Sequence, residues 1–125
     1  MTPVAGDSAQ GDGGQRVLDA VLIAAPDAIG EWMRHEALFI DVREPREWNL
    51  FRIPGAVHVP LGTVGDRMRD GETIAAHDRR IVVYCGRGNR SRRAAAWLAA
   101  WGYSAVRSLD GGVMEWIFCN GTVEE

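Results

Sequence analysis

The residue best placed for chemistry in this chain is Cys85, which ends a short apolar segment and opens a loop rich in glycine and arginine. The loop reads Cys-Gly-Arg-Gly-Asn-Arg-Ser over residues 85–91 and runs directly into an alanine-rich segment typical of a helix. Positive charge and a helix N-terminus both favour the thiolate, which is the nucleophilic form of cysteine. A structural cysteine at a strand end would have apolar neighbours instead. The pattern therefore indicates a reactive cysteine at a strand-to-helix junction.

The residues after Cys85 are predicted to form a cradle for negative charge. Glycines at positions 86 and 88 allow a tight turn in which backbone N–H groups converge on one centre. Arg90 would lie at the rim, where its planar guanidinium suits an oxyanion. We expect Ser91 to be the N-cap of the following helix, which is a structural role. The predicted substrate-binding residues are Gly86, Arg87, Gly88, Asn89, Arg90 and Ser91.

Three other residues are candidates for a supporting part. Asp41 and Arg43 follow a short apolar strand, where functional side chains gather, and an ion pair that fixes the loops is an equally good interpretation. Cys119 lies near the end of the last predicted helix. It is interpreted as a packing residue or bystander, with a resolving thiol as the alternative.

Short apolar segments alternate with helical patterns along the chain. The elements that they predict must position the loop over residues 85–91. Strands are expected at 38–40, 57–59, 81–84 and about 105–109, and helices from residue 26, over 91–101 and over 113–118. The apolar segment 17–23 is too short for its period to distinguish helix from strand. This order predicts an α/β fold of three layers, with a mostly parallel sheet of about five strands covered on both faces. Binding sites in such sheets lie beyond the carboxyl ends of strands, where Cys85 is expected.

Length and composition restrict the class of protein. A chain of 125 residues fits one domain, predicted over 16–125, after a glycine-rich tail over 1–15 that we expect to be flexible. With 46% hydrophobic residues, 25% charged residues and a net charge of −3, nothing favours nucleic acid or a membrane as partner. The N-terminus lacks a signal-peptide pattern, and two distant cysteines predict neither a disulfide framework nor a metal site. A cytoplasmic location is the expectation.

Four motifs in order resemble the single-domain rhodanese family of thiosulfate sulfurtransferases, over roughly residues 21–123. The family's loop, Cys-x-x-Gly-x-Arg-Ser, is matched by residues 85–91, and its Asp-Val-Arg…Glu-aromatic segment is similar to residues 41–48. Its Ile-Pro-Gly-Ala turn is matched at 53–56. Its closing signature is matched by Gly-Tyr at 102–103, Leu-Asp-Gly-Gly at 109–112 and Trp116. Two departures stand out: Phe51-Arg52 replaces the usual Gly-His, and Gly86-Arg87 replaces a basic residue followed by a small one.

The resemblance implies a cofactor-free and metal-free reaction in two steps. The Cys85 thiolate would take the outer sulfur of thiosulfate or a similar small-molecule donor. The resulting persulfide would then pass this sulfur to cyanide or a thiol acceptor. A sulfur-relay protein is a further expected partner.

Three alternatives remain at this stage. A phosphatase or arsenate reductase of similar fold would place its arginine six positions after the cysteine, where this chain has Ser91. A non-enzymatic interaction module would usually lack the cysteine. A persulfide carrier or sensor that serves a partner protein would need the same loop as the enzyme, so the sequence does not exclude it.

Overall fold

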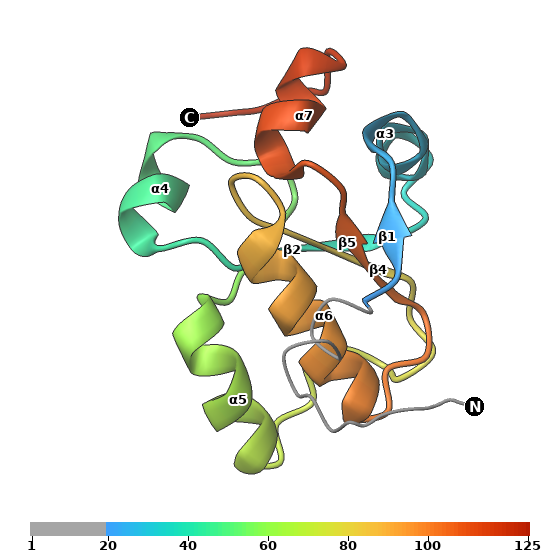
Figure 1. Ribbon diagram of the computed structural model, residues 1–125, viewed down its shortest axis with the longest axis vertical. Coiled ribbons are helices and arrows are strands. Elements are labelled where there is room, and N and C mark those ends of the chain that lie inside the picture. The colour runs from blue at the N-terminus through green and yellow to red at the C-terminus, as the bar shows by residue number, and fades with distance from the viewer. Residues whose placement is uncertain (1–19) are drawn as a thin grey trace, which may run out of the picture.

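The computed structural model describes residues 20–125, which form a five-stranded sheet in the order β1-β5-β4-β2-β3, with every pairing parallel (Figure 1). The strands are β1 Leu22–Ile23, β2 Leu38–Asp41, β3 Val57–His58, β4 Ile81–Tyr84 and β5 Val106–Leu109. The predicted α/β fold with a parallel sheet of about five strands is confirmed. The tail predicted over 1–15 and residues 16–19 of the predicted domain lie outside the described residues.

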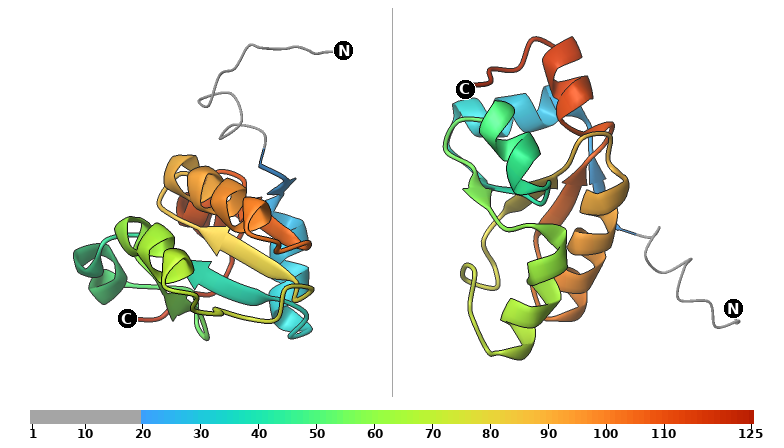
Figure 2. Two further views of the ribbon diagram at one scale, coloured as in Figure 1. Left: turned by 90° about the horizontal axis from the view of Figure 1, so that it is seen from below. Right: turned by 90° about the vertical axis from the view of Figure 1, so that its left-hand side faces the viewer.

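Helices cover both faces of the sheet, as Figure 2 shows. The helices are α3 Ala25–Met33, α4 Pro45–Leu50, α5 Leu61–Arg69, α6 Asn89–Ala100 and α7 Gly112–Phe118. The pair α3 and α7 packs on one face, and the pair α5 and α6 packs on the other. Within residues 20–125, every helix is too short or too polar to cross a bilayer.

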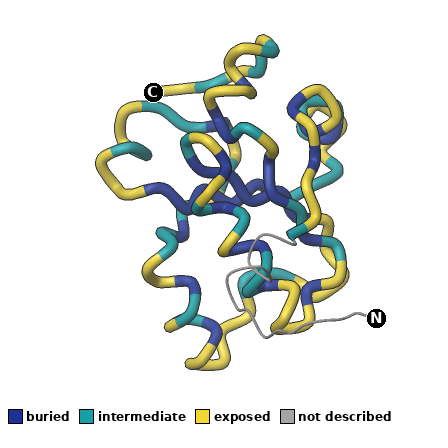
Figure 3. The backbone as a smooth tube through the Cα atoms, in the orientation of Figure 1, coloured by how far each residue is buried: buried dark blue, intermediate teal, exposed yellow. Residues whose placement is uncertain are grey.

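The hydrophobic core consists of two clusters, one on each face of the sheet, and the side chains of the central strand β4 alternate between them. Ile81 and Val83 pack with α5 and α6, whereas Val82 and Tyr84 pack with α3 and α7. This alternation is the two-residue period of a strand buried on both faces. Cys85 continues it and belongs to the α6 cluster. Figure 3 shows the buried segments gathered at the centre of the molecule, and Cys85, at 1% exposure, extends the buried run of β4.

Two helices were not predicted from the sequence, and both lack a strong local signal. Helix α4 is a short helix that begins at Pro45, and none of its residues is buried. Helix α5 buries only Val64 and Met68 and contains two glycines, which lower helix propensity. Its helical state depends on packing against α6 rather than on its own sequence.

The strand predicted over 57–59 lies at the edge of the sheet. Strand β3 pairs only with β2, and Val57 keeps 42% of its surface exposed. Val59, just beyond the strand, is fully buried in the cluster of α5 and α6. The strand is therefore confirmed over Val57–His58, while its burial is confined to the residue that follows it.

Replacing Trp116 by alanine should lower the free energy of unfolding by about 3–5 kcal/mol, because this side chain of α7 is fully buried against α3 and the sheet. The matched control is Trp101→Ala, since Trp101 is 40% exposed and should cost less than about 1 kcal/mol. Urea denaturation followed by circular dichroism measures both. Equal losses for the two variants would contradict this account of the core.

Candidate functional site

Cys85 lies directly after β4, at the floor of a surface pocket of about 400 Å³. The residue is only 1% exposed, and it lines this pocket. The pocket is lined by Glu47, Cys85, Gly86, Arg87, Asn89, Arg90 and Met114. The position matches the expected one, beyond the carboxyl end of a central parallel strand.

Two backbone N–H groups point at the sulfur of Cys85. The N–H of Gly88 donates to Sγ at 3.1 Å, and the N–H of Ser91 donates to Sγ at 3.4 Å. Gly88 makes the turn with a φ of 109°, a left-handed conformation that side chains disfavour, and it is the N-cap of α6. The loop therefore aims the start of a helix at one sulfur atom, which is the arrangement that binds negative charge.

Ser91 has a different place from the one predicted. The N-cap is Gly88, so Ser91 lies within the first turn of α6 and is fully buried. Its Oγ donates to the carbonyl of Gly88 at 3.2 Å, lies 2.8 Å from Oγ of Ser108, and is 3.5 Å from the Cys85 sulfur. The prediction of a capping residue was wrong, because the N-cap is Gly88, three residues earlier. The hydroxyl is instead a direct neighbour of the sulfur.

The first turn of α7 fixes the loop from the other side. The N–H groups of Val113 and Met114 donate to the carbonyls of Cys85 and Gly86 at 2.8 and 3.2 Å. Gly112 lies so close to this loop that a Cβ on it would be 2.4 Å from the Gly86 oxygen. Its φ of 67° is also in the left-handed region. The sequence analysis gave this glycine no structural role, although it belongs to the Leu-Asp-Gly-Gly motif.

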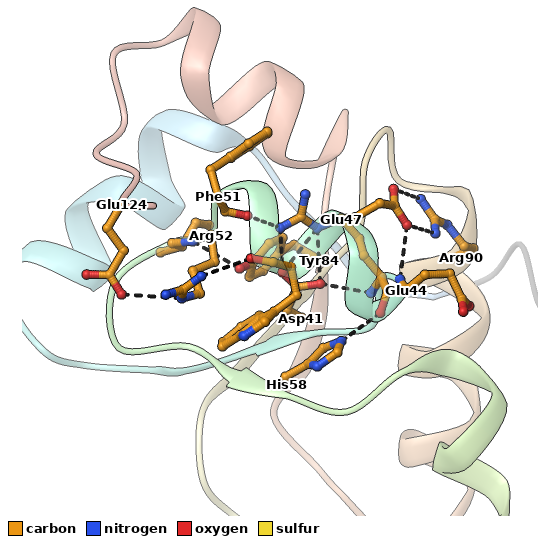
Figure 4. Close-up of polar contacts among 12 residues, drawn as sticks. Asp41, Glu44, Glu47, Phe51, Arg52, His58, Tyr84, Arg90 and Glu124 are labelled. Atoms are coloured by element: carbon orange, nitrogen blue, oxygen red, sulfur yellow. Dashed lines mark hydrogen bonds and ion pairs between the residues drawn. The ribbon is translucent and has the colours of Figure 1, made fainter.

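Glu47 lines the pocket, although the sequence analysis gave it no role. Its carboxylate makes a two-pronged ion pair with Arg90, at 2.7 Å from Nη1 and 3.0 Å from Nη2 (Figure 4). It also accepts the N–H of Glu44 at 3.0 Å. The hydrogen bond from Arg90, with the backbone bond and the nearby positive charges, outweighs partial burial and lowers the pKa of Glu47 to about 2. The loop over residues 85–91 contains no acidic residue, but Glu47 of α4 forms an ion pair with its Arg90.

Arg90 is therefore at the rim, as expected, with both terminal nitrogens engaged. The hydrogen bond to Glu47 raises the pKa of Arg90, and the nearby Cys85 sulfur adds to this effect. The other arginines near the loop differ in their surroundings. Arg92 lies 3.5 Å from Asp110, whereas Arg87 is exposed in the pocket with no acidic partner among residues 20–125. Asn89, the first residue of α6, is exposed beside it.

Asp41 and Arg43 form the ion pair that one interpretation of the sequence predicted. Nη2 of Arg43 lies 2.8 Å from Oδ2 of Asp41, and both side chains are buried. The same nitrogen donates to the carbonyl of Phe51 at 2.6 Å, and the guanidinium lies 5.0 Å from the Phe51 ring centre. Neither residue lines the pocket. The pair instead holds the carboxyl end of α4, the helix that carries Glu47.

Phe51 and Arg52, which replace the family's usual Gly-His, also make contacts that hold α4 in place. The Trp48 ring of α4 lies between the His58 ring, stacked at 4.8 Å, and the Arg52 guanidinium at 4.9 Å. Arg52 also exchanges backbone hydrogen bonds with Glu124, and its guanidinium lies 3.6 Å from the Glu124 carboxylate (Figure 4). These contacts tie the segment after α4 to the end of the chain. Phe51 and Arg52 thus both take part in the packing around the end of α4.

Cys119 lies at the end of α7 farther from the Cys85 loop. Burial and the Glu115 carboxylate both raise the pKa of its thiol. Its Sγ lies 3.7 Å from Oε2 of Glu115, and its neighbours belong to the cluster on the other face of the sheet. The structure does not bring the two cysteines together.

A family model and a curated relative both relate this chain to rhodanese-type proteins. The family model described as "Rhodanese-like domain" matches residues 25–119. The thiosulfate sulfurtransferase GlpE of Pseudomonas syringae pv. syringae is 38% identical over 80 residues, which cover 64% of this chain and 72% of that relative.

Solved structures agree on the fold. A rhodanese-related protein from Thermoplasma volcanium has a TM-score of 0.73 and 26% identity, and the match covers 83% of this chain and 97% of that one. A protein of unknown function from Rhodopseudomonas palustris, described as a possible tyrosine phosphatase, has a TM-score of 0.77 and 22% identity, covering 94% of this chain and 98% of that one. At this identity the second likeness concerns the fold alone.

The substitution Gly112→Ala should displace the Cys85 loop and cost at least about 2 kcal/mol, because it adds a clash with the Gly86 carbonyl to an unfavourable φ. The control is Gly62→Ala in α5, where a Cβ meets nothing within 4 Å. It should stabilise the protein by roughly 0.5–1 kcal/mol. Urea unfolding of both variants checks the opposite signs, and a neutral Gly112→Ala would contradict the close contact.

The ion pair of Glu47 and Arg90 should stabilise the fold in a pH-dependent way. Because the pKa of Glu47 is lowered to about 2, the stabilisation is complete above its ordinary pKa of about 4.3 and is lost as the pH falls toward 2. Since both side chains are a third exposed, the effect should be only about 1 kcal/mol. Unfolding free energies of the unsubstituted protein and Glu47→Gln, measured from pH 7 to pH 2, should converge at the acid end. A constant difference down to pH 2 would contradict this.

Proposed function

The chain belongs to the family of rhodanese-like domains, and from this premise we propose that it is a sulfurtransferase that carries a sulfane sulfur as a persulfide on Cys85. The observation that carries the proposal is the pair of N–H groups, from Gly88 and Ser91, that donate to Sγ at the floor of the pocket. Donors aimed at one atom stabilise negative charge there both before and after sulfur is added. The name of the GlpE relative supports thiosulfate as a donor.

In the first half of the reaction, the Cys85 thiolate attacks the outer sulfur of the donor. With thiosulfate, the new S–S bond forms as the old one breaks, and sulfite leaves with the electron pair. Cys85 is left as a persulfide whose terminal sulfur carries the negative charge. The pocket of about 400 Å³ offers room for the donor above the sulfur.

In the second half, a thiophilic acceptor attacks the terminal sulfur. Cyanide leaves as thiocyanate, and a thiolate leaves as a new persulfide, while the electron pair of the broken bond returns to Cys85. No proton has to be moved in the cycle with thiosulfate and cyanide. This agrees with a pocket whose lining contains no histidine.

The other residues of the pocket have proposed parts in binding. The exposed Arg87 supplies the positive charge for an anionic donor, and Asn89 at the start of α6 adds a polar group. Arg90 forms the wall beside the sulfur and is oriented by Glu47. Asp41 and Arg43 act indirectly, because they anchor the helix that presents Glu47.

The loop does not favour the phosphatase alternative. An arginine six positions after the cysteine would be needed, and that position is the buried Ser91, whose hydroxyl is bonded to Gly88 and Ser108. Arg90 precedes it and is paired with Glu47. The expected hydrolysis of p-nitrophenyl phosphate is therefore negligible.

The substitution Cys85→Ala should abolish the thiosulfate:cyanide reaction, by at least about a thousandfold in kcat, because no other thiol lines the pocket. The matched control is Cys119→Ala, which removes the other free cysteine at the far end of α7 and should leave the turnover within about twofold. Thiocyanate formation measures both.

Activity that survives Cys85→Ala would contradict the assignment of the nucleophile. A protein whose Cys85 accepts sulfur from a donor protein yet turns over little thiosulfate would be a persulfide carrier in a relay. In that case the persulfide chemistry would stand, and the partner would be a protein.

A further inference from the structure

We propose that exposed apolar residues of α4 and α7 form a docking surface for a partner protein, one that presents a cysteine between apolar side chains and next to an acidic one. The docking surface consists of Leu50, Met114, Ile117 and Phe118. The inference rests on the proposed function, because the docked partner would take up the sulfur carried by Cys85.

Helix α7 carries an apolar stripe that begins at the pocket of the candidate site. Met114 lines this pocket, and Ile117 and Phe118 follow it by three and four residues, the spacing that places side chains on one side of a helix. All three are exposed, and Phe118 leaves 82% of its surface in contact with solvent. The other side of α7 is buried through Val113 and Trp116. The stripe is therefore not part of the core.

Helix α4 adds an apolar residue on another side of the pocket. Glu47 lines the pocket, and Leu50 lies three residues later on the same side of the helix, with 66% of its surface exposed. Figure 1 shows α4 and α7 beside the loop that precedes α6, with the end of the chain running from α7 toward α4. Exposed apolar side chains thus flank the mouth of the pocket on two helices.

The extent of the docking surface favours a protein over a small molecule. The pocket of about 400 Å³ has room for a cysteine side chain or a small acceptor. Phe118 lies about 6 Å farther along α7 than Met114, at the rise of an α-helix, so a small acceptor in the pocket would leave it uncovered. Exposed apolar patches next to a functional site mark interaction surfaces, and phenylalanine and methionine are enriched in protein interfaces.

The charge at the mouth of the pocket indicates the acidic residue of the partner. Glu47 balances Arg90, whereas Arg87 is exposed in the pocket without an acidic neighbour in the part of the chain that the structure describes. An aspartate or glutamate next to the partner's cysteine would pair with Arg87. Such a pair fixes the register of two docked surfaces as well as attracting them.

The transfer to the docked partner is balanced without a further reactant. The thiolate of the partner attacks the terminal sulfur of the Cys85 persulfide, and a new S–S bond forms on the partner. The S–S bond to Cys85 breaks, and its electron pair returns to Cys85 as a thiolate. The partner leaves as a persulfide anion, so the total charge is unchanged and no proton moves.

The test uses protein loaded with sulfur from thiosulfate, together with two synthetic peptide thiols that imitate the surface of the partner. In the apolar peptide, a leucine and a phenylalanine flank an aspartate–cysteine pair. In the polar peptide, serines replace the leucine and the phenylalanine, and the charge is the same. The unsubstituted protein should lose its added sulfur to the apolar peptide at least roughly tenfold faster per unit concentration. Mass spectrometry of the quenched protein measures both rate constants.

Substitutions outside the pocket lining locate the effect on the docking surface. Phe118→Ser and Leu50→Ser should each lower the rate constant for the apolar peptide roughly three- to tenfold. The rates with the polar peptide and with cyanide should stay within about twofold, because neither residue lines the pocket. The matched control is Met33→Ser, which replaces a similarly exposed apolar residue at the end of α3 and should change none of the rates.

Four results decide against the inference. Equal rates for the two peptides would overturn it, and so would equal losses in Phe118→Ser and Met33→Ser. A dimer in sedimentation that Phe118→Ser dissociates would show that a second copy of this chain covers the surface, which also overturns it. If Cys85 took up no sulfur from thiosulfate, the proposed function would fail and the inference with it. Normal loading without a preference between the peptides would overturn the inference alone.

Discussion

The N–H groups of Gly88 and Ser91 both donate to the Cys85 sulfur, and the rest of the site exists to keep that geometry. Cys85 directly follows the central strand β4, beyond its carboxyl end. Helix α6 begins next to it, so that N–H groups at the start of the helix donate to the sulfur. From the other side, the first turn of α7 binds the carbonyls of Cys85 and Gly86, and it approaches so closely that only glycine fits at 112. Because backbone groups make these contacts, their geometry is set by the fold and not by side-chain rotamers.

The side chains around this cradle adjust its charge. Glu47 arrives from α4 and pairs with Arg90, so an arginine that looked free in the sequence is neutralised in the fold. The buried pair of Asp41 and Arg43 and the stacking of Trp48 hold α4 in the position that this requires. The position of Glu47 beside the Cys85 loop therefore depends on contacts at the other end of α4.

The parallel sheet, the strand-to-helix junction and the position of Cys85 could be predicted because each depends on local pattern: apolar runs, glycine turns and a helical alanine segment. The ion pair of Glu47 and Arg90 could not, since its partners are 43 residues apart and meet only through tertiary packing. Helix α5 was missed because packing on α6, rather than propensity, makes it helical. Ser91 was misplaced for a simpler reason: a glycine that tolerates a left-handed conformation started the helix before the serine could cap it.

The most direct test of the account is the mass of the intact protein after incubation with thiosulfate and no acceptor. If the cradle at Cys85 holds a persulfide, the mass should rise by one sulfur atom, about 32 Da, per chain, and peptide mapping should locate it on Cys85. Cyanide should remove the added mass. An unchanged mass, or a sulfur found on Cys119 instead, would contradict the account.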